Sequence, residues 1–260
     1  MQKPEELKIV LIGAGNLATN LGKALLHAGY RIAGVYSRTE ESARTLAGLL
    51  DTSFTTSLSG LPNDADLYLV SLKDSVLEEL LPQIVPGREH ALFIHTSGSI
   101  PMQIWEGKAT RYGVFYPLQT FSKQREVSFR EIPLFLEASD KASYSLLEKL
   151  AGELSEKIYP ATSGQRSYLH LSAVFACNFT NHMYAISEQI LREHQLPFEV
   201  MLPLIDETAR KVHHLPPVQA QTGPAVRYDR NIIDKHLELL ADKPEIQEIY
   251  EKISKSIHNS

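Results

Sequence analysis

The feature that most constrains this chain is a glycine-rich turn between a predicted strand and a predicted helix. Residues 9–12 form a short apolar run rich in β-branched side chains, typical of a strand buried on both faces of a parallel sheet. Residues 13–18 then read Gly-Ala-Gly-Asn-Leu-Ala and fit the pattern G-x-G-x-x-A. In that pattern the first glycine permits a tight turn and the second lets a pyrophosphate approach the backbone. A helix predicted over residues 16–27 places its N-terminus against the phosphates.

The residues after the next predicted strand, 31–36, indicate which dinucleotide is bound. NAD-binding versions usually place a carboxylate there, to accept hydrogen bonds from the ribose hydroxyls. Here the strand is followed by Ser37, Arg38 and Thr39, and the first carboxylate is that of Glu40. Arg38 can pair with a 2′-phosphate, and the two hydroxyls can donate hydrogen bonds to it. The sequence therefore predicts NADP. The alternatives are a solvated loop arginine and a glycine turn in some other doubly wound protein.

Composition narrows the class of protein. The net charge is -5 and there is no basic run, so nothing favours a nucleic-acid partner. The only cysteine, Cys177, excludes an internal disulfide and fits a reducing compartment. No apolar run approaches the ~18 residues expected of a membrane span, and the first residues lack the apolar core of a signal peptide. We expect a cytoplasmic protein without a membrane partner.

Further strands are predicted near residues 66–71, 91–95, 112–119, 132–137 and 157–160, with helices between several of them. Ligands of open α/β sheets bind outside the carboxyl ends of the strands, so the loops that follow 71 and 95 are predicted to line the cofactor. Lys73 lies in the first of these loops. The alternative to a cofactor contact is that its side chain is simply solvated. The predicted cofactor-binding residues are Gly13, Ala14, Gly15, Asn16, Leu17, Ala18, Ser37, Arg38, Thr39, Ser71, Leu72, Lys73 and Ser97.

The composition changes after Pro160, which places a predicted domain boundary between residues 1–160 and 161–260. The second part is expected to be helical. Residues 168–193 lack Gly and Pro and carry apolar side chains at helical spacing, which predicts one long helix with extensively buried faces. Three more helices are predicted, over residues 199–213, 231–241 and 244–257, and a turn-rich loop, 221–230, precedes the second of them.

Four stretches together resemble a known family: VLIGAGNLA, HTSGS, FYPLQTF and TGPAVRYDRNIIDKHLELL. They look like Rossmann-like proteins with a C-terminal domain of unknown function, which are commonly described as NADP oxidoreductases. The N-terminal half of that family is similar to pyrroline-carboxylate reductases and deazaflavin-dependent NADP oxidoreductases. Its helical half is similar in layout to the second domain of 6-phosphogluconate and β-hydroxyacid dehydrogenases. The resemblance implies a doubly wound α/β Rossmann sheet followed by an all-α domain, a cofactor cleft closed by that domain, and a homodimer formed through it.

This sequence departs from its relatives at two points. β-Hydroxyacid dehydrogenases carry a helix-borne lysine four residues before an asparagine, whereas the long helix here contains no lysine. Their proton-transfer machinery therefore does not carry over. Relatives more often have histidine before Pro-Leu-Gln, where this chain has Tyr116, which puts any role of that histidine in doubt.

Hydride transfer usually needs a group that supplies or takes a proton, and the helical part offers candidates. His170 and Asn178 lie eight residues apart, which places them on the same broad side of an ideal α-helix. His170 is the predicted proton donor, and Asn178 is predicted to orient a carbonyl or carboxylate. The alternative for His170 is a satisfied core or interface histidine.

Arg227 is the predicted substrate-binding residue, because its guanidinium can clamp a carboxylate or phosphate. A salt bridge with Asp229 or a dimer contact is the alternative. No metal site is predicted, since His213 and His214 diverge by about 100° on a helix and no second pair has ligand spacing.

Three hypotheses for function remain open on the sequence alone. The leading one is an NADP-dependent reductase or dehydrogenase of a small carbonyl or imine compound. The second is a non-catalytic NADP-binding sensor or partner protein, since no proton relay is recognisable. The third is a doubly wound enzyme that binds another nucleotide or a nucleotide-sugar in the same turn.

Overall fold

The computed structural model describes residues 7–260. Residues 1–6, where the sequence predicts no signal peptide, lie outside the described residues. The chain forms two compact units, one ending at Cys177 and the other beginning at Asn178. The units divide later than the predicted boundary at 160/161, which stays a prediction. Each unit is described by itself below.

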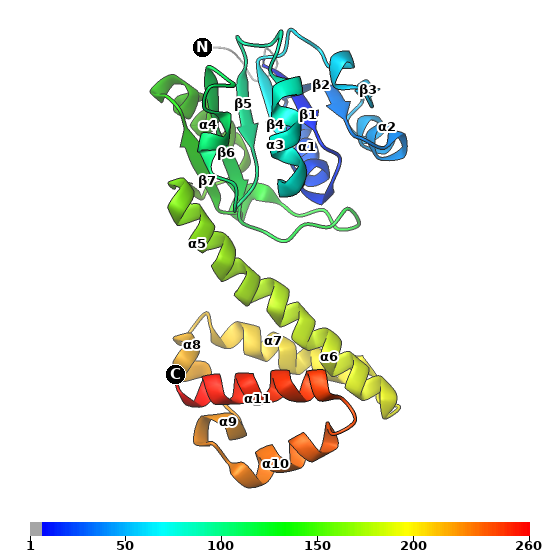
Figure 1. The fold of residues 1–260 in the computed structure, drawn as a ribbon, viewed down its shortest axis with the longest axis vertical. Helices are drawn as coiled ribbons and strands as arrows, with labels where there is room; N and C mark the ends of the chain where they lie inside the picture. The colour runs from blue at the N-terminus through cyan, green and yellow to red at the C-terminus, as the bar shows by residue number, and fades with distance from the viewer. Residues whose placement is uncertain (1–6) are drawn as a thin grey trace. The chain divides into compact units, whose positions relative to one another are not determined.

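The first unit is built on one eight-stranded sheet (Figure 1). Its order is β3-β2-β1-β4-β5-β6-β7-β8, and every neighbouring pair is parallel except β6 and β7. The chain turns outward from β1 in both directions, toward β2 and toward β4, which is the doubly wound arrangement predicted from the sequence. The strands are β1 (Lys8–Ile12), β2 (Arg31–Tyr36), β3 (Phe54–Thr55), β4 (Leu67–Val70), β5 (Leu92–His95), β6 (Arg111–Pro117), β7 (Leu134–Ala138) and β8 (Ile158–Pro160).

Both faces of this sheet are covered, and alternate residues of each central strand face opposite sides. In β1, Ile9 and Leu11 join one core and Val10 and Ile12 join the other. Helices α1, α2 and α4 cover the first core, while α3 and the short helices η2 and η3 cover the second. The helical elements of the first unit are α1 (Asn16–His27), α2 (Glu40–Leu49), η2 (Leu58–Gly60), α3 (Asp74–Ile84), η3 (Met102–Trp105), η4 (Phe129–Glu131), α4 (Lys141–Leu154) and α5 (Ser163–Ala173).

The strand register brings the carboxyl ends of β1, β2, β4, β5 and β6 to one edge of the sheet. Ile12 lies opposite Tyr36 on one side and Val70 on the other. Val70 in turn lies opposite His95, which lies opposite Val114. The loops that follow β1, β2, β4 and β5 therefore start at the same level, as the sequence predicted for the cofactor edge, while β6 continues past it to Pro117.

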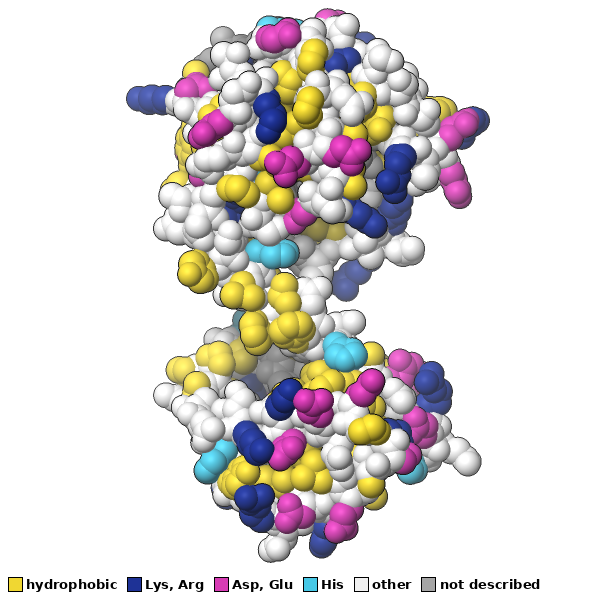
Figure 2. Space-filling model, in the orientation of Figure 1, with side chains coloured by type: hydrophobic (Ala, Val, Ile, Leu, Met, Phe, Trp, Pro, Cys, Tyr) yellow, Lys and Arg dark blue, Asp and Glu magenta, His cyan; other side chains and the backbone are white. Residues whose placement is uncertain are grey.

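The predicted long helical stretch is present, but the prediction that its faces are extensively buried is wrong. Helix α5 is followed directly by a π-helical segment, η5 (Val174–Phe179), and then by α6 (Thr180–Glu193). Arg166 is the one buried residue of α5, and α6 has none. Tyr168 is 74% exposed, and hydrophobic side chains gather along this stretch in Figure 2. The apolar period correctly indicates a helix, but it does not say whether the apolar face is buried within the chain.

Helices joined by turns make up the regular secondary structure of the second unit, residues 178–260. A short helix, α9 (Pro224–Arg227), lies inside the predicted loop 221–230, so that stretch is not loop alone. Among residues 178–260, the buried hydrophobic side chains are those of Ala225 and Ile233. Over residues 7–260, no helix combines the length and the apolar character needed to cross a membrane. The remaining helices are η6 (Phe198–Met201), α7 (Leu202–Lys211), α8 (Pro217–Ala220), α10 (Arg230–Leu239) and α11 (Pro244–His258).

Candidate cofactor site and active site

The first glycine of the turn is required by the protein's own backbone. Gly13 has φ +119°, and a Cβ at this position would lie 2.1 Å from the carbonyl oxygen of Ser71. The Gly13 amide donates a 2.8 Å hydrogen bond to the Tyr36 carbonyl, and the Ser71 amide donates one of 2.8 Å to that of Ile12. The turn is thus fixed against the ends of two neighbouring strands. Any residue other than glycine would break this packing.

The second glycine leaves the helix N-terminus open. Gly15 is the N-cap of α1, no side chain caps the helix, and its first turn holds no acidic residue. A Cβ at Gly15 would meet no atom within 4 Å. Ala18 beneath it is fully buried, so the helix packs closely on the sheet. Free backbone N–H groups at the positive end of a helix bind phosphate, so these residues fit the pyrophosphate of a dinucleotide.

The predicted 2′-phosphate site at the end of β2 is open to solvent. Ser37 is half-buried, whereas Arg38 and Thr39 are exposed. Within residues 7–260 the Arg38 side chain makes no hydrogen bond or ion pair. The neighbouring carboxylate of Glu40 is paired with Arg44 one turn along α2. A cation without a partner beside a neutralised carboxylate favours an anionic ligand.

The loop after β4 begins α3. Ser71 and Leu72 are half-buried, and the Leu72 side chain packs against the second core. Lys73 is the N-cap of α3, its side chain is exposed, and its carbonyl accepts the amides of Val76 and Leu77. All three predicted contacts therefore lie at the cofactor edge, with Lys73 as the charged group among them.

The loop after β5 is organised by Ser97. The Ser97 hydroxyl accepts the backbone amides of Ser99 at 3.2 Å and Ile100 at 3.0 Å. The Ser97 amide donates to Nδ1 of His95 at 3.2 Å. Ser97 thus shapes its own loop, and its hydroxyl donates at 3.3 Å to that of Ser99, which itself donates to the Asp74 carboxylate.

His95 is a structural residue. It is fully buried, and burial lowers the pKa of its imidazole to about 3, with the positive charge of Arg166 acting in the same direction. The ring is therefore neutral at neutral pH, so it does not serve as a proton donor there. Its Nδ1 accepts the Ser97 amide, and its buried Nε2 has no hydrogen-bond partner within residues 7–260.

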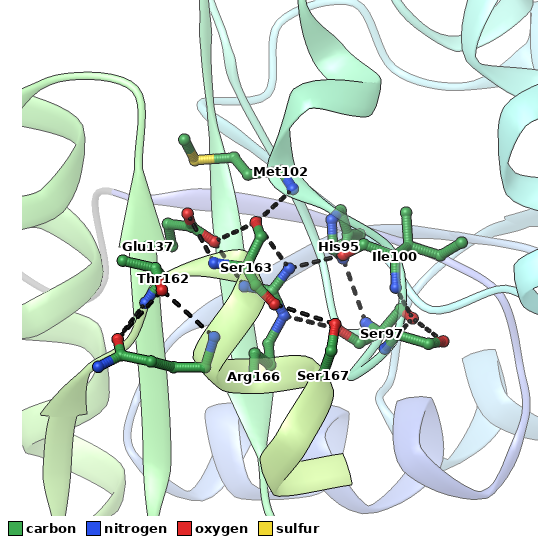
Figure 3. A network of polar contacts seen from close by, with 11 residues as sticks. His95, Ser97, Ile100, Met102, Glu137, Thr162, Ser163, Arg166 and Ser167 are labelled. Carbon is green, nitrogen blue, oxygen red and sulfur yellow. Dashed lines mark hydrogen bonds and ion pairs between the residues drawn. The ribbon is translucent and has the colours of Figure 1, made fainter. Parts of the chain in front are cut away.

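A buried ion pair joins α5 to β7, and its arginine also donates hydrogen bonds to this loop (Figure 3). The Arg166 side chain is 1% exposed and its Nη1 lies 2.5 Å from Oε2 of Glu137 on β7. The same guanidinium donates to the carbonyls of Ser97 at 3.1 Å and Ile100 at 2.6 Å. Glu137 also accepts the hydroxyl of Ser163, at 2.7 Å. Because every strong donor here is matched, the network fixes the first turns of α5 against the loop after β5.

His170 lies one turn beyond Arg166 and meets Tyr116 at the end of β6. The Tyr116 hydroxyl is 3.2 Å from Nδ1 of His170, and the rings meet edge to face. Burial raises the pKa of Tyr116 above its ordinary value, and Arg166 offsets part of that rise. A Cβ on Gly98 would lie 2.8 Å from Cβ and Nδ1 of His170, so this glycine permits the close approach. His170 thus stands against the loop at the cofactor edge.

Sequence reasoning missed several members of this arrangement. It noted Tyr116 only as a departure from relatives, and it did not select Arg166, Glu137 or Gly98. One signal was present, since Arg166 precedes His170 by four residues and so shares its helix face. No pattern in the sequence indicates that Glu137, on a strand distant in sequence, is the partner of Arg166.

The other two candidates lie outside the unit that contains His170. Asn178 and Arg227 are exposed and belong to the second unit. Asn178 falls within the π-helical segment η5, so the two-turn spacing of an ideal α-helix does not apply between it and His170. The ion pair between Arg227 and Asp229, which was the alternative for this arginine, is absent from residues 7–260. The roles of Asn178 and Arg227 stay predictions.

These features define a Rossmann-like dinucleotide-binding protein with a helical C-terminal part. Residues 8–98 match the family model "NADP oxidoreductase coenzyme F420-dependent", and residues 132–257 match that of a domain of unknown function, DUF2520. A solved Bacteroides fragilis protein, assigned as an NADP oxidoreductase, is 60% identical over 99% of this chain and 100% of its own, with a TM-score of 0.97. The chain belongs to this family of NADP oxidoreductases, so it is an oxidoreductase of the NADP class.

More distant structures share the fold. An imine reductase from Myxococcus stipitatus, solved with NADP⁺, is 17% identical over 97% of this chain and 92% of its own, with a TM-score of 0.65. A 1-pyrroline-5-carboxylate reductase from Streptococcus pyogenes is 13% identical over 98% of this chain and 99% of its own, with a TM-score of 0.63. No curated protein sequence matches the chain.

Proposed function

We propose that this protein transfers a hydride between NADPH and a small carbonyl or imine compound, with His170 as the proton donor. The observation that carries the proposal is the hydrogen bond between His170 and Tyr116 beside the loop after β5. A titratable group is thereby held at the edge where the cofactor residues gather. The imine and pyrroline-carboxylate reductases that share the fold support the substrate class.

In this mechanism the bound NADPH supplies the hydride, and the residues of the chain place and protonate the substrate. The α1 N-terminus holds the pyrophosphate, and Arg38 with Ser37 and Thr39 holds the 2′-phosphate. Tyr116 stays protonated because its pKa is raised, and its oxygen accepts a hydrogen bond from Nδ1–H of the imidazolium form of His170. The other ring nitrogen, Nε2, gives its proton to the substrate's oxygen or nitrogen and leaves a neutral imidazole.

A screen for NADPH oxidation over carbonyl and imine compounds tests this function, with Gly15→Ala as the matched inactive control. The added methyl meets no protein atom, so the variant should fold with a loss of about 1 kcal/mol at most. It should lose NADPH binding, because the methyl stands where the pyrophosphate approaches. Substrate-dependent oxidation by the wild type alone supports the proposal, and equal rates for the two proteins refute it.

A non-catalytic NADP-binding partner protein is the second candidate. The exposed apolar face of α5, with Tyr168 at 74% and Leu171 at 51%, favours it because such a face suits a protein partner. This candidate predicts tight NADPH binding without turnover in the same screen.

Arg38→Ala is expected to weaken NADPH binding by about 10- to 100-fold, which corresponds to one charge-assisted contact with the 2′-phosphate. NADH lacks that phosphate, so its affinity should change less than about twofold. Calorimetric titration with both cofactors measures the two effects. An equal loss for both would show that Arg38 does not select the cofactor.

The remaining predictions concern the helical unit. We propose that Asn178 and Arg227 contact the substrate and that the protein is a cytoplasmic homodimer. The near absence of buried hydrophobic side chains in residues 178–260 supports a dimer, because a unit of this size needs a larger core than it has alone. The molar mass in solution tests this proposal.

A further inference from the structure

The connection between β6 and β7, residues 118–133, is longer than a hairpin requires. Its ends are adjacent, since Pro117 pairs with Leu134 and the Leu118 amide donates to the Pro133 carbonyl at 2.9 Å. The only regular structure within it is the short helix η4. We call this segment the β6–β7 strap; Figure 1 shows it in green along one edge of the sheet. Long connections of this kind in compact domains are usually functional.

The strap is fastened to α1, at the turn that follows the glycine motif. Asn20 is 4% exposed, and its Nδ2 donates at 3.0 Å both to the Asn16 carbonyl and to the Ser122 carbonyl. One amide nitrogen therefore lies between the first residue of α1 and the strap. A side chain this deeply buried with two matched bonds holds the strap in a defined position.

Two further sets of contacts fix the rest of the strap. Phe121 stacks on Phe129 with ring centroids 5.6 Å apart, and Phe121 packs against the first core. Glu126 lies 3.2 Å from Nζ of Lys23, farther along α1. The strap thus runs alongside α1 from its first turn toward its middle.

The fastening leaves Lys123 next to the open end of α1. Lys123 follows Ser122 directly and is exposed, and within residues 7–260 it makes no ion pair or hydrogen bond. Arg125 is likewise exposed without an ion pair, but it lies beside Glu126, on the side of the strap that runs away from the first turn. The flexible four-carbon stem of Lys123 lets its ammonium reach an anion bound at that turn.

We infer that the β6–β7 strap forms a second wall of the pyrophosphate site and that Lys123 pairs with the pyrophosphate. This inference rests on the proposed binding of NADPH at the α1 N-terminus. The helix N–H groups contact the phosphates from one side, and Lys123 supplies the positive charge that α1 itself lacks in its first turn. The pyrophosphate is common to NADPH and NADH, so Lys123 contributes affinity without selecting between them.

Lys123→Ala is therefore expected to weaken NADPH and NADH binding by the same factor, about tenfold at low salt. Calorimetric titration with both cofactors measures it, and the factor should shrink as salt is added because the ion pair is partly solvated. Lys123→Arg should restore most of the affinity. Arg125→Ala is the matched control, since it removes a strap cation farther from the first turn and should change both affinities less than twofold.

The outcomes separate this inference from the function on which it rests. A wild-type protein that binds neither cofactor refutes the proposed function. A wild-type protein that binds NADPH, with Lys123→Ala within twofold of it, overturns the role of Lys123 alone. A loss confined to NADPH also overturns it, because Lys123 would then contact the 2′-phosphate and not the pyrophosphate.

Discussion

Replacing His170 by Gln is expected to lower kcat for substrate-dependent NADPH oxidation by about 10²- to 10⁴-fold, the usual contribution of a positioned general acid. Glutamine keeps a polar side chain of similar length but does not titrate. NADPH affinity should stay within about twofold, because His170 faces the loop after β5 and the Tyr116 hydroxyl, not the glycine turn. Steady-state kinetics and calorimetric titration of the same preparations measure the two quantities.

Tyr116→Phe is the companion variant for this test. It keeps the ring that packs edge to face on His170 and removes only the hydroxyl at 3.2 Å. We expect a smaller loss of kcat, about tenfold, since Tyr116 positions the imidazole and does not donate the proton itself. Because the pKa of Tyr116 is raised, its hydroxyl stays protonated throughout the neutral range and gives no activity limb there. Full activity of His170→Gln on an identified substrate would remove His170 from the mechanism.

Glu137→Leu is expected to destabilise the protein by about 3–5 kcal/mol, the usual result of removing one partner of a buried ion pair. The guanidinium of Arg166 is 1% exposed and would keep only neutral acceptors, the carbonyls of Ser97 and Ile100 and the Ser163 hydroxyl. Equilibrium unfolding in urea, followed by circular dichroism, measures the change in free energy.

Two further variants make this measurement specific. Glu137→Leu combined with Arg166→Met should recover part of the lost stability, because no uncompensated charge then remains buried. Glu40→Gln removes an exposed i,i+4 pair with Arg44 and should cost less than about 0.5 kcal/mol. If Glu137→Leu costs no more than Glu40→Gln, the buried pair does not hold α5 to the loop after β5.

The local elements that place the cofactor could be predicted from the sequence. The helix over residues 16–27 matches α1, and the predicted strand before it matches β1 within a residue. These predictions succeed because strand, glycine turn and helix are decided by neighbouring residues. Gly13 shows the limit of the motif. Its φ of +119° is what the pattern expects, but the group it approaches most closely is the Ser71 carbonyl.

The polar arrangement around His170 could not be predicted in the same way. Arg166 and Glu137 are 29 residues apart in sequence, and they meet because β7 pairs antiparallel with β6 and α5 starts beside it. Likewise, Ser122 reaches Asn20 across 102 residues of sequence. Such pairs depend on strand order and on the path of a long loop, which hydrophobic periodicity does not encode.

By itself the sequence determined the strand, glycine turn and helix at its start, and it predicted NADP as the cofactor. These follow from backbone preferences and charges within a few residues, such as Gly15 at a helix start and Arg38 after a strand, whereas the doubly wound sheet was implied by the family resemblance. Only the tertiary structure decided which groups surround His170, that Asn20 fastens the strap to α1, and that α5 leaves its apolar face exposed. The physical reason is that these contacts join distant segments, so their energies depend on the whole packed chain and not on any one stretch of it.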